Sequence, residues 1–128
     1  MAGYTLTNFD QIDNALADRD LPIDARFARK HLDSRELGVS RFRYEPGTRA
    51  PFGHSHREQE EAYVVTSGSG RVKLDDEIVD LNQWDVLRVA PEVVRGFEAG
   101  PDGLEVLAIG GTRPEDGDGV PVRDWWTD

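Results

Sequence analysis

Two histidines and a glutamate follow one another closely in a pattern that can bind a metal ion. They are His54, His56 and Glu61. On a β-strand, residues two apart project to the same side, so His54 and His56 point together. Glu61 lies at an odd offset from both, and the polar stretch 57–60 can form the turn that folds it back towards the imidazoles. Two imidazoles and one carboxylate form a ligand set that suits Fe, Mn, Ni or Zn.

Composition excludes several other kinds of site and partner. The chain has no cysteine, which rules out disulfides, thiolate catalysis and cysteine-type zinc sites. Its formal net charge of -10 argues against electrostatic binding to nucleic acid or to an anionic membrane. Residues 1–10 lack a signal-peptide pattern, and no apolar run is long enough to cross a membrane. We therefore expect a cytoplasmic protein.

The rest of the chain is typical of an all-β domain. Short runs with alternating apolar and polar residues, such as Leu37–Tyr44, recur between Gly/Pro-rich breaks. Two of these breaks, Ser67–Gly70 and Gly100–Gly103, are predicted to be tight turns. Many short strands with little helix indicate a β-sandwich or barrel.

A single domain is expected at 128 residues, with a segment on either side of the barrel. The first segment, residues 1–36, is predicted to contain a short helix over Gln11–Ala17 and a strand over Ala25–His31. The barrel is predicted over residues 37–111. The last segment, residues 112–128, combines an acidic, Gly/Pro-rich linker with a tail.

The metal-binding stretch resembles the first motif of the cupin superfamily. The motif reads His54-Ser55-His56, four residues, Glu61, six residues and then Gly68. The upstream glycine, Gly47, lies one residue further from His54 than is usual. The resemblance, to a small single-domain cupin of the Cupin_2 type, implies that the two histidines and Glu61 are metal ligands. It also implies a double-stranded β-helix, the cupin jelly-roll barrel.

The second cupin motif is altered in this chain. Trp84 stands where glycine is usual, and Glu92 stands at the turn glycine. Arg95 stands where the resemblance predicts a fourth ligand, a histidine. A guanidinium stays protonated and has no lone pair for a metal, so the usual ligand set is incomplete.

Two functions are compatible with this substitution. In the first, the two histidines and Glu61 hold a divalent metal, and Arg95 helps to bind a small anionic metabolite. In the second, a metal-free cupin binds a small molecule or is purely structural, and Arg95 pairs with Glu61. Tyr63, Phe97 and Phe52 are predicted to line the barrel and contact the ligand. Whether the protein is an enzyme stays open.

The tail and the sheet edges suggest a homodimer. Trp125 and Trp126 would be costly to leave exposed on a loose tail, so we expect the tail to pack on the barrel or on a partner subunit. Cupins often form dimers, and the resemblance implies the same here. The third histidine, His31, stands alone and is interpreted as a surface or strand-packing residue.

Overall fold

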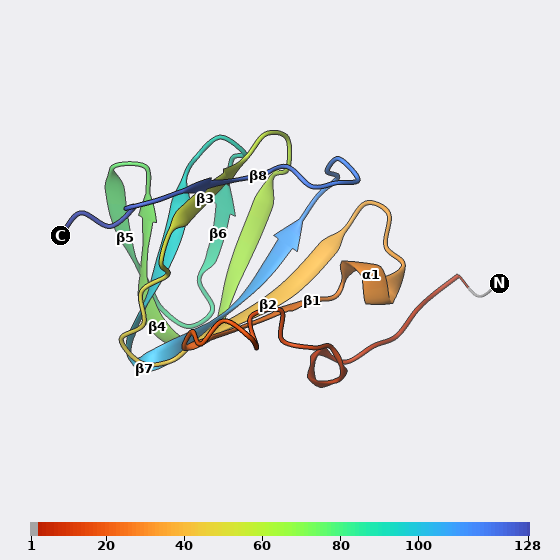
Figure 1. The fold of residues 1–128 in the computed structure, drawn as a ribbon, viewed down its shortest axis with the longest axis horizontal. Helices are drawn as coiled ribbons and strands as arrows, with labels where there is room; N and C mark the ends of the chain where they lie inside the picture. Colours follow the sequence, from red (N-terminus) through yellow and green to blue (C-terminus); the bar gives the residue numbers. More distant parts are fainter. Residues whose placement is uncertain (1–2) are drawn as a thin grey trace.

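The computed structural model describes residues 3–128, and most of its regular structure is β-strand (Figure 1). The elements in chain order are the 3-10 helix η1 (Phe9–Gln11), β1 (Ile23–Phe27), the helix α1 (Arg29–Leu32), β2 (Gly38–Tyr44), β3 (Gly53–His56), β4 (Glu61–Leu74), β5 (Glu77–Leu81), β6 (Val86–Val89), β7 (Arg95–Gly110) and β8 (Gly119–Val122).

Two long antiparallel strands, β4 and β7, form the frame of the barrel. Their pairing runs from Glu61 opposite Gly110 to Leu74 opposite Arg95. One end of this ribbon lies between β2 and β6, and β1 extends that side beyond β2. The other end lies between β3 and β5, and β8 extends that side beyond β3. The two five-stranded layers therefore share β4 and β7, as expected for the predicted jelly-roll barrel.

Glycines allow the long strands to pass from one layer to the other. The register of β4 against β7 shifts twice, between Val65 and Ser67 and between Gly68 and Gly70. Gly68 and Gly103 both have positive φ angles, of 75° and 82°. A Cβ atom on Gly68 would collide with the carbonyl oxygen of Gly103. The positive φ and the close approach together require glycine at this bend.

These bends correct two predicted turns. Ser67–Gly70 and Gly100–Gly103 do not end their strands, because each lies inside a continuous strand. The glycines mark β-bulges, which have the same sequence signature as turns.

The segment before the barrel also differs from its prediction. The short N-terminal helix is the 3-10 helix η1, which spans Phe9–Gln11 and is capped by the Asn8 side chain, and the predicted helix over Gln11–Ala17 is wrong in position. The predicted strand over Ala25–His31 is confirmed only as far as Phe27, because α1 begins at Arg29.

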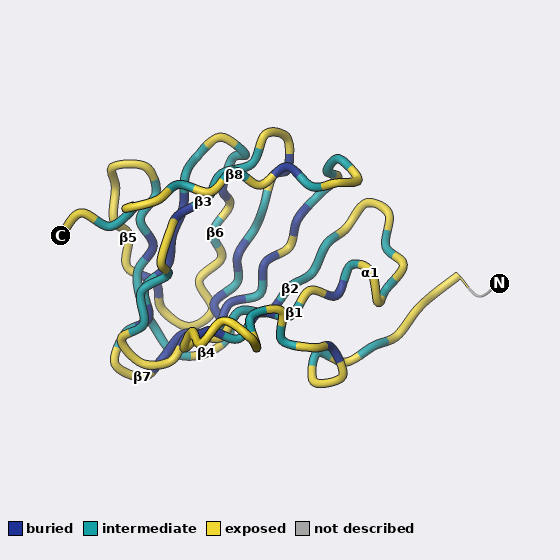
Figure 2. Tube along the Cα trace, viewed as in Figure 1, coloured by how far each residue is buried: buried dark blue, intermediate teal, exposed yellow. Residues whose placement is uncertain are grey.

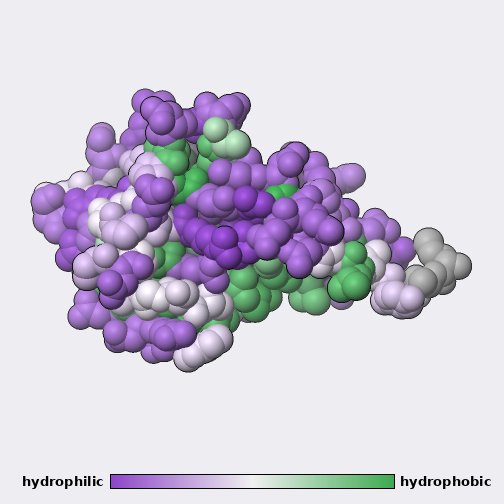
Figure 3. Space-filling model, turned by 90° about the horizontal axis from the view of Figure 1, so that it is seen from below, coloured by the Kyte–Doolittle hydropathy of each residue, from purple (hydrophilic) through white to green (hydrophobic). Residues whose placement is uncertain are grey.

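The core lies between the two layers, and the buried residues gather along β4 and β7 (Figure 2). The most deeply buried apolar side chains, Val65, Val72 and Val106, come from these two strands. Tyr63 packs against Phe97 with ring centroids 4.9 Å apart. Seen from below the view of Figure 1, the surface is mainly hydrophilic with separate apolar patches (Figure 3).

The last residues lie against the same chain. β8 pairs with β3, and Trp125 covers Gly53 and Gly96 while its Nε1 donates to the carbonyl oxygen of Lys73 at 3.3 Å. The ring of Trp126 packs against two guanidinium groups, with its centroid 4.5 Å from Cζ of Arg49 and 5.5 Å from Cζ of Arg71. Within residues 3–128, no helix has the length and apolar character needed to span a membrane.

Trp84 generates a prediction about stability. Its φ is +70° and its side chain is 66% exposed, so it bears backbone strain while burying little surface. Relief of that strain is worth about 1–2 kcal/mol and exceeds the entropic cost of glycine, about 0.4–1 kcal/mol. We expect Trp84→Gly to be more stable than Trp84→Ala by about 0.5–1 kcal/mol in urea unfolding. Both variants remove the indole, so equal stabilities would show that the strain is absent.

Candidate metal centre and ligand cavity

The two histidines and Glu61 converge because β3 and the start of β4 face one another inside the barrel. His54 and His56 alternate with Ser55 on β3 and therefore share a face. Glu61 is the first residue of β4, directly after the connection from β3. One nitrogen of each histidine and one oxygen of Glu61 all lie within 4.8 Å of one another. The spacing in the sequence thus predicts this convergence.

The distances within this triad are close to those of a metal-ligand set. His56 Nε2 lies 3.0 Å from Glu61 Oε1, and His54 Nε2 lies 3.7 Å from the same oxygen. Ligands bound to one ion at roughly 2.0–2.2 Å are separated from each other by about 3–3.5 Å. Small adjustments of the side chains would therefore let the three residues coordinate one ion.

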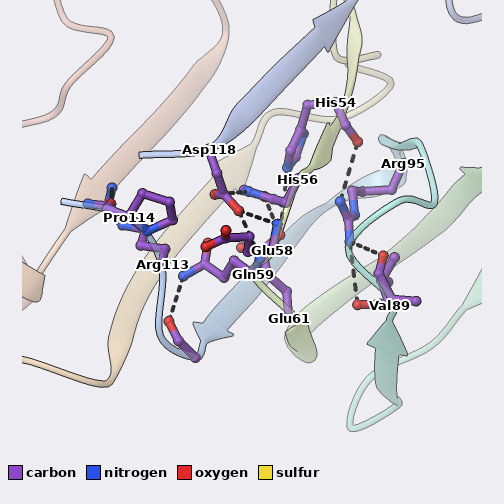
Figure 4. Close-up of polar contacts among 12 residues, drawn as sticks. His54, His56, Glu58, Gln59, Glu61, Val89, Arg95, Arg113, Pro114 and Asp118 are labelled. Atoms are coloured by element: carbon purple, nitrogen blue, oxygen red, sulfur yellow. Dashed lines mark hydrogen bonds and ion pairs between the residues drawn. The ribbon is translucent and has the colours of Figure 1, made fainter. Parts of the chain in front are cut away.

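Asp118 holds His56 in a defined orientation. Its Oδ1 lies 2.9 Å from His56 Nδ1, and its Oδ2 accepts the backbone N–H groups of Glu58 and Gln59, both at 2.8 Å (Figure 4). The Asp118 side chain is only 1% exposed. With Nδ1 as the donor to Asp118, His56 turns its Nε2 lone pair towards Glu61.

The free nitrogen of His56 is the observation that best fits a metal. Its Nε2 is buried and has no hydrogen-bond partner in the described part of the chain, although Glu61 Oε1 is near. A buried polar atom without a partner is costly, so such atoms usually have a ligand, an ion or a water. A carboxylate on Nδ1 and an open Nε2 are the arrangement of metal-binding histidines.

The electrostatics of the triad keep Glu61 ionised. Burial alone would raise the pKa of Glu61, but its contacts with His54, His56 and Tyr63 outweigh burial and hold the pKa well below its usual range. Burial would lower the pKa of His56, but Glu61 and Asp118 reverse this effect and raise it. Ionised Glu61 is the form that can bind a cation.

Arg95 is buried next to the triad but does not pair with Glu61. Its guanidinium donates to the backbone oxygens of His54 at 3.5 Å, Val89 at 3.5 Å and Ala90 at 3.1 Å (Figure 4). Glu61 instead contacts the two histidines and accepts a hydrogen bond from the Tyr63 hydroxyl. The predicted ion pair between Arg95 and Glu61 is therefore wrong, because backbone carbonyls take up the guanidinium.

A cavity of about 690 Å³ opens beside the triad. His54, His56 and Glu61 lie in its wall, and so does Phe52, one of the predicted ligand-binding residues. The other apolar side chains in the wall come mainly from the N-terminal segment, β1 and β2: Leu16, Leu21, Ile23, Phe27, Phe42 and Tyr44.

Three other predicted ligand-binding residues, Arg95, Tyr63 and Phe97, lie behind this wall. All three side chains are buried, and none of them lines the cavity. Tyr63 acts on the triad through its hydroxyl, and Phe97 packs behind Tyr63. The structure gives them supporting positions, and their direct contact with a ligand stays a prediction.

Two residues of the site were missed at the level of sequence. Asp118 lies in the segment interpreted as an acidic linker, and no pattern distinguishes it from Asp116. Gln59 lies in the stretch interpreted as a solvated turn, yet it is only 5% exposed and donates from Nε2 to the Gly111 carbonyl oxygen at 3.0 Å. Only the three-dimensional pairing of β3 with β8 brings Asp118 to the histidines.

Asp118→Asn tests whether this carboxylate orients His56. An amide has one acceptor oxygen, so it cannot serve both the imidazole and the two backbone N–H groups. We expect Zn²⁺ affinity to fall about 10- to 100-fold. In metal-free protein at a pH where the imidazole is neutral, NMR should show His56 protonated on Nδ1, and on a mixture of both nitrogens in the variant.

Asp116→Asn is the matched control, since Asp116 is exposed and lies two residues away in the same segment. An Asp118→Asn variant that kept the wild-type tautomer and Zn²⁺ affinity would show that Asp118 has no orienting role.

Comparison with known proteins agrees with this fold. The chain is 26% identical to a cupin protein from Bacteroides fragilis, with a TM-score of 0.73 over 100% of this chain and 99% of that one. Oxalate decarboxylase from Bacillus subtilis is 23% identical, with a TM-score of 0.74 over 91% of this chain but only 32% of the enzyme. A Streptomyces PAC13 variant with uridine is 19% identical, with a TM-score of 0.73 over 94% of this chain and 92% of that one.

No protein with a curated description matches the chain. The family model Cupin_2, described as the cupin domain, matches residues 40–110, which is more than half of the chain. This match covers β2 to β7 and includes the triad, so the protein belongs to the cupin domain family.

Proposed function

We propose that this cupin binds a divalent metal ion through His54, His56 and Glu61 and takes a small anionic organic molecule in the adjoining cavity. The observation that carries the proposal is the convergence, within 4.8 Å of one another, of one nitrogen from each histidine and one oxygen of the ionised Glu61, with His56 oriented by Asp118. Fe, Mn, Ni and Zn all suit two imidazoles and one carboxylate. Such an ion, when bound, polarises a ligand or water at its open positions.

The chain's own residues support this role in two ways. Asp118 and Tyr63 hold His56 and Glu61 in place from outside the triad, so the ligand atoms are ordered before any ion arrives. The side chain of His54 is 37% exposed, whereas those of His56 and Glu61 are each 12% exposed. The triad is therefore approached from the side of His54 and the cavity.

A metal-free binding protein is the second candidate, and Arg95 favours it. The guanidinium is fully buried, its Nε has no hydrogen-bond partner in residues 3–128, and its positive charge opposes the protonation of His56. The same charge disfavours a cation at the triad. In this case the histidines would be donors to the ligand.

The fold does not by itself select a ligand or a reaction. The similar structures include an oxalate decarboxylase, named for a dicarboxylate, and a protein in complex with the nucleoside uridine. The same fold is thus found with chemically different small molecules. The homodimer and the cytoplasmic location stay predictions for this chain, and whether it is an enzyme stays open.

Metal analysis of untagged protein tests the first candidate. We expect one equivalent of bound metal in wild type and at least a 10-fold loss of affinity in His56→Ala, because removing a ligand leaves only two protein donors. His31→Ala is the control, since His31 lies outside the triad. Metal content that does not change in His56→Ala, or that falls equally in His31→Ala, would rule out the triad as the metal site.

Arg95→His tests whether position 95 faces the metal site. Arg95 is the direct cross-strand neighbour of His54, and such neighbours project to the same face. Replacing it with histidine removes a positive charge and adds a fourth donor, whereas Arg95→Gln removes only the charge. We expect Arg95→His to bind Zn²⁺ about 10-fold more tightly than Arg95→Gln in isothermal titration. Equal affinities would show that position 95 does not face the ion.

A further inference from the structure

The cavity is rich in positive charge although the chain as a whole is acidic. The net charge of the chain is -10, but the cavity wall carries four cationic side chains and only two carboxylates. The carboxylates, Glu61 and Asp118, are already engaged by the histidines. The cationic residues are Arg19, Arg29, Lys30 and Arg113.

None of these four cations has a carboxylate partner within residues 3–128, and Arg29 and Arg113 stand out because they are also half-buried, whereas Arg19 and Lys30 are exposed. Most of the other arginines in contact with the barrel, including Arg26, Arg43 and Arg49, form an ion pair with Asp or Glu. Two half-buried guanidinium groups without a counter-ion leave positive charge uncompensated in the cavity wall.

The backbone makes room for Arg29 at a defined place. Arg29 is the first residue of α1, and its Nη2 donates to the Gly111 carbonyl oxygen at 3.1 Å. A Cβ atom on Gly38 would lie 2.6 Å from the same Nη2, so a larger residue at position 38 would displace the guanidinium from this place. Burial lowers the pKa of Arg29, and repulsion from Arg113 lowers it further.

Arg113 reaches the same cavity from the segment after β7, two residues beyond the Gly111 carbonyl that accepts from Arg29. It follows β7, and its Nη1 donates only to the carbonyl oxygen of the neighbouring Pro114, at 3.4 Å. In Figure 4, Arg113 lies on the opposite side of the histidines from Arg95. The Arg113 side is the side of the cavity, because Arg113 lines it and Arg95 does not.

Hydrogen bonds connect Arg29 to the triad. The Gly111 carbonyl oxygen that accepts from Arg29 also accepts from Gln59 Nε2. The backbone N–H of Gln59 donates to Asp118, which in turn contacts His56. The position of Arg29 is thus set relative to His56 by fixed groups, and apolar side chains line the same cavity.

We propose that Arg29 and Arg113 form a subsite for the anionic group of the ligand, which is an organic molecule with an apolar body and a terminal oxyanion. The oxyanion lies between the two guanidinium groups, and the other end of the molecule reaches His54, His56 and Glu61. Carboxylates and phosphate monoesters share this chemistry, since both accept paired N–H donors from arginine. The inference rests on the proposed function because it assigns the ligand to the same cavity.

Binding of three matched probes tests the subsite. The probes are 4-phenylbutanoate, its uncharged analogue 4-phenylbutanamide, and phenyl phosphate, each titrated by calorimetry into wild-type protein with and without EDTA. We expect at least one anion to bind 10-fold or more tightly than the amide. The anion that binds more tightly identifies a carboxylate or a phosphate ester as the oxyanion.

The variants Arg29→Gln and Arg113→Gln should each lower the affinity for the anion about 10-fold and leave the affinity for the amide unchanged. Arg123→Gln is the control, because it removes the same charge from an exposed residue that does not line the cavity. Arg113→Gln covers the possibility that Arg29→Gln disturbs folding, since Arg113 makes no long-range hydrogen bond within residues 3–128. Circular dichroism and thermal unfolding verify that each variant is folded.

Three results would overturn the subsite. These are equal affinity for anion and amide, no detectable binding of any probe, and an equal loss in Arg123→Gln and Arg113→Gln. Anion binding that requires metal and survives both arginine substitutions would also overturn it, while leaving the metal site intact. Conversely, anion binding that persists in EDTA and depends on Arg29 and Arg113 supports the subsite even if no metal binds to the triad.

Discussion

The site depends on one buried carboxylate, that of Asp118. It engages an imidazole through one oxygen and two consecutive backbone N–H groups through the other. The same contacts therefore determine the ring orientation of His56 and the course of the connection that delivers Glu61. Backbone and imidazole N–H donors lower the pKa of Asp118 despite its burial, so the carboxylate stays charged. A buried charge with three donors is well compensated, and this makes it a rigid anchor.

Small residues in the frame give the larger side chains their places. Gly38 and Gly110 are direct partners across β2 and β7, and neither could carry a Cβ atom without striking a functional neighbour. The space beside Gly38 holds the Arg29 guanidinium, and the space beside Gly110 holds the Gln59 amide. Because these two facing glycines have no side chains, the sheet leaves room there for two polar groups beside the apolar residues of the cavity wall.

The local pattern of the sequence predicts the triad because its parts are close in the chain. The two-residue step on a strand and a short polar connection are enough to bring His54, His56 and Glu61 together. The jelly-roll barrel is predicted as well, from alternation and from the family motif. The bends at Gly68 and Gly103 are not, because glycine marks a turn and a bulge alike.

The remaining parts of the site come from pairings that no local pattern encodes. Asp118 reaches His56 only through the pairing of β8 with β3, across 62 residues of sequence. Most of the large apolar side chains that line the cavity come from the N-terminal segment, β1 and β2. These elements precede the His-x-His motif, so the motif does not predict them. Arg95 was recognised as an altered position, but its acceptors are backbone oxygens, which every residue has.

The attachment of β3 has a consequence for exchange kinetics. This strand meets β7 at a single residue pair, His54 opposite Arg95, whereas it meets β8 along its whole length. β3 and β8 therefore form a two-stranded ribbon with few backbone hydrogen bonds to the frame, and Trp125 packs across the junction between Gly53 and Gly96. Glu61 belongs to the frame and both histidines belong to the ribbon. An ion at the triad would cross-link the two parts, and local opening of this ribbon would move two of the three ligands away from the third, which adds a route for metal release to the one through the cavity.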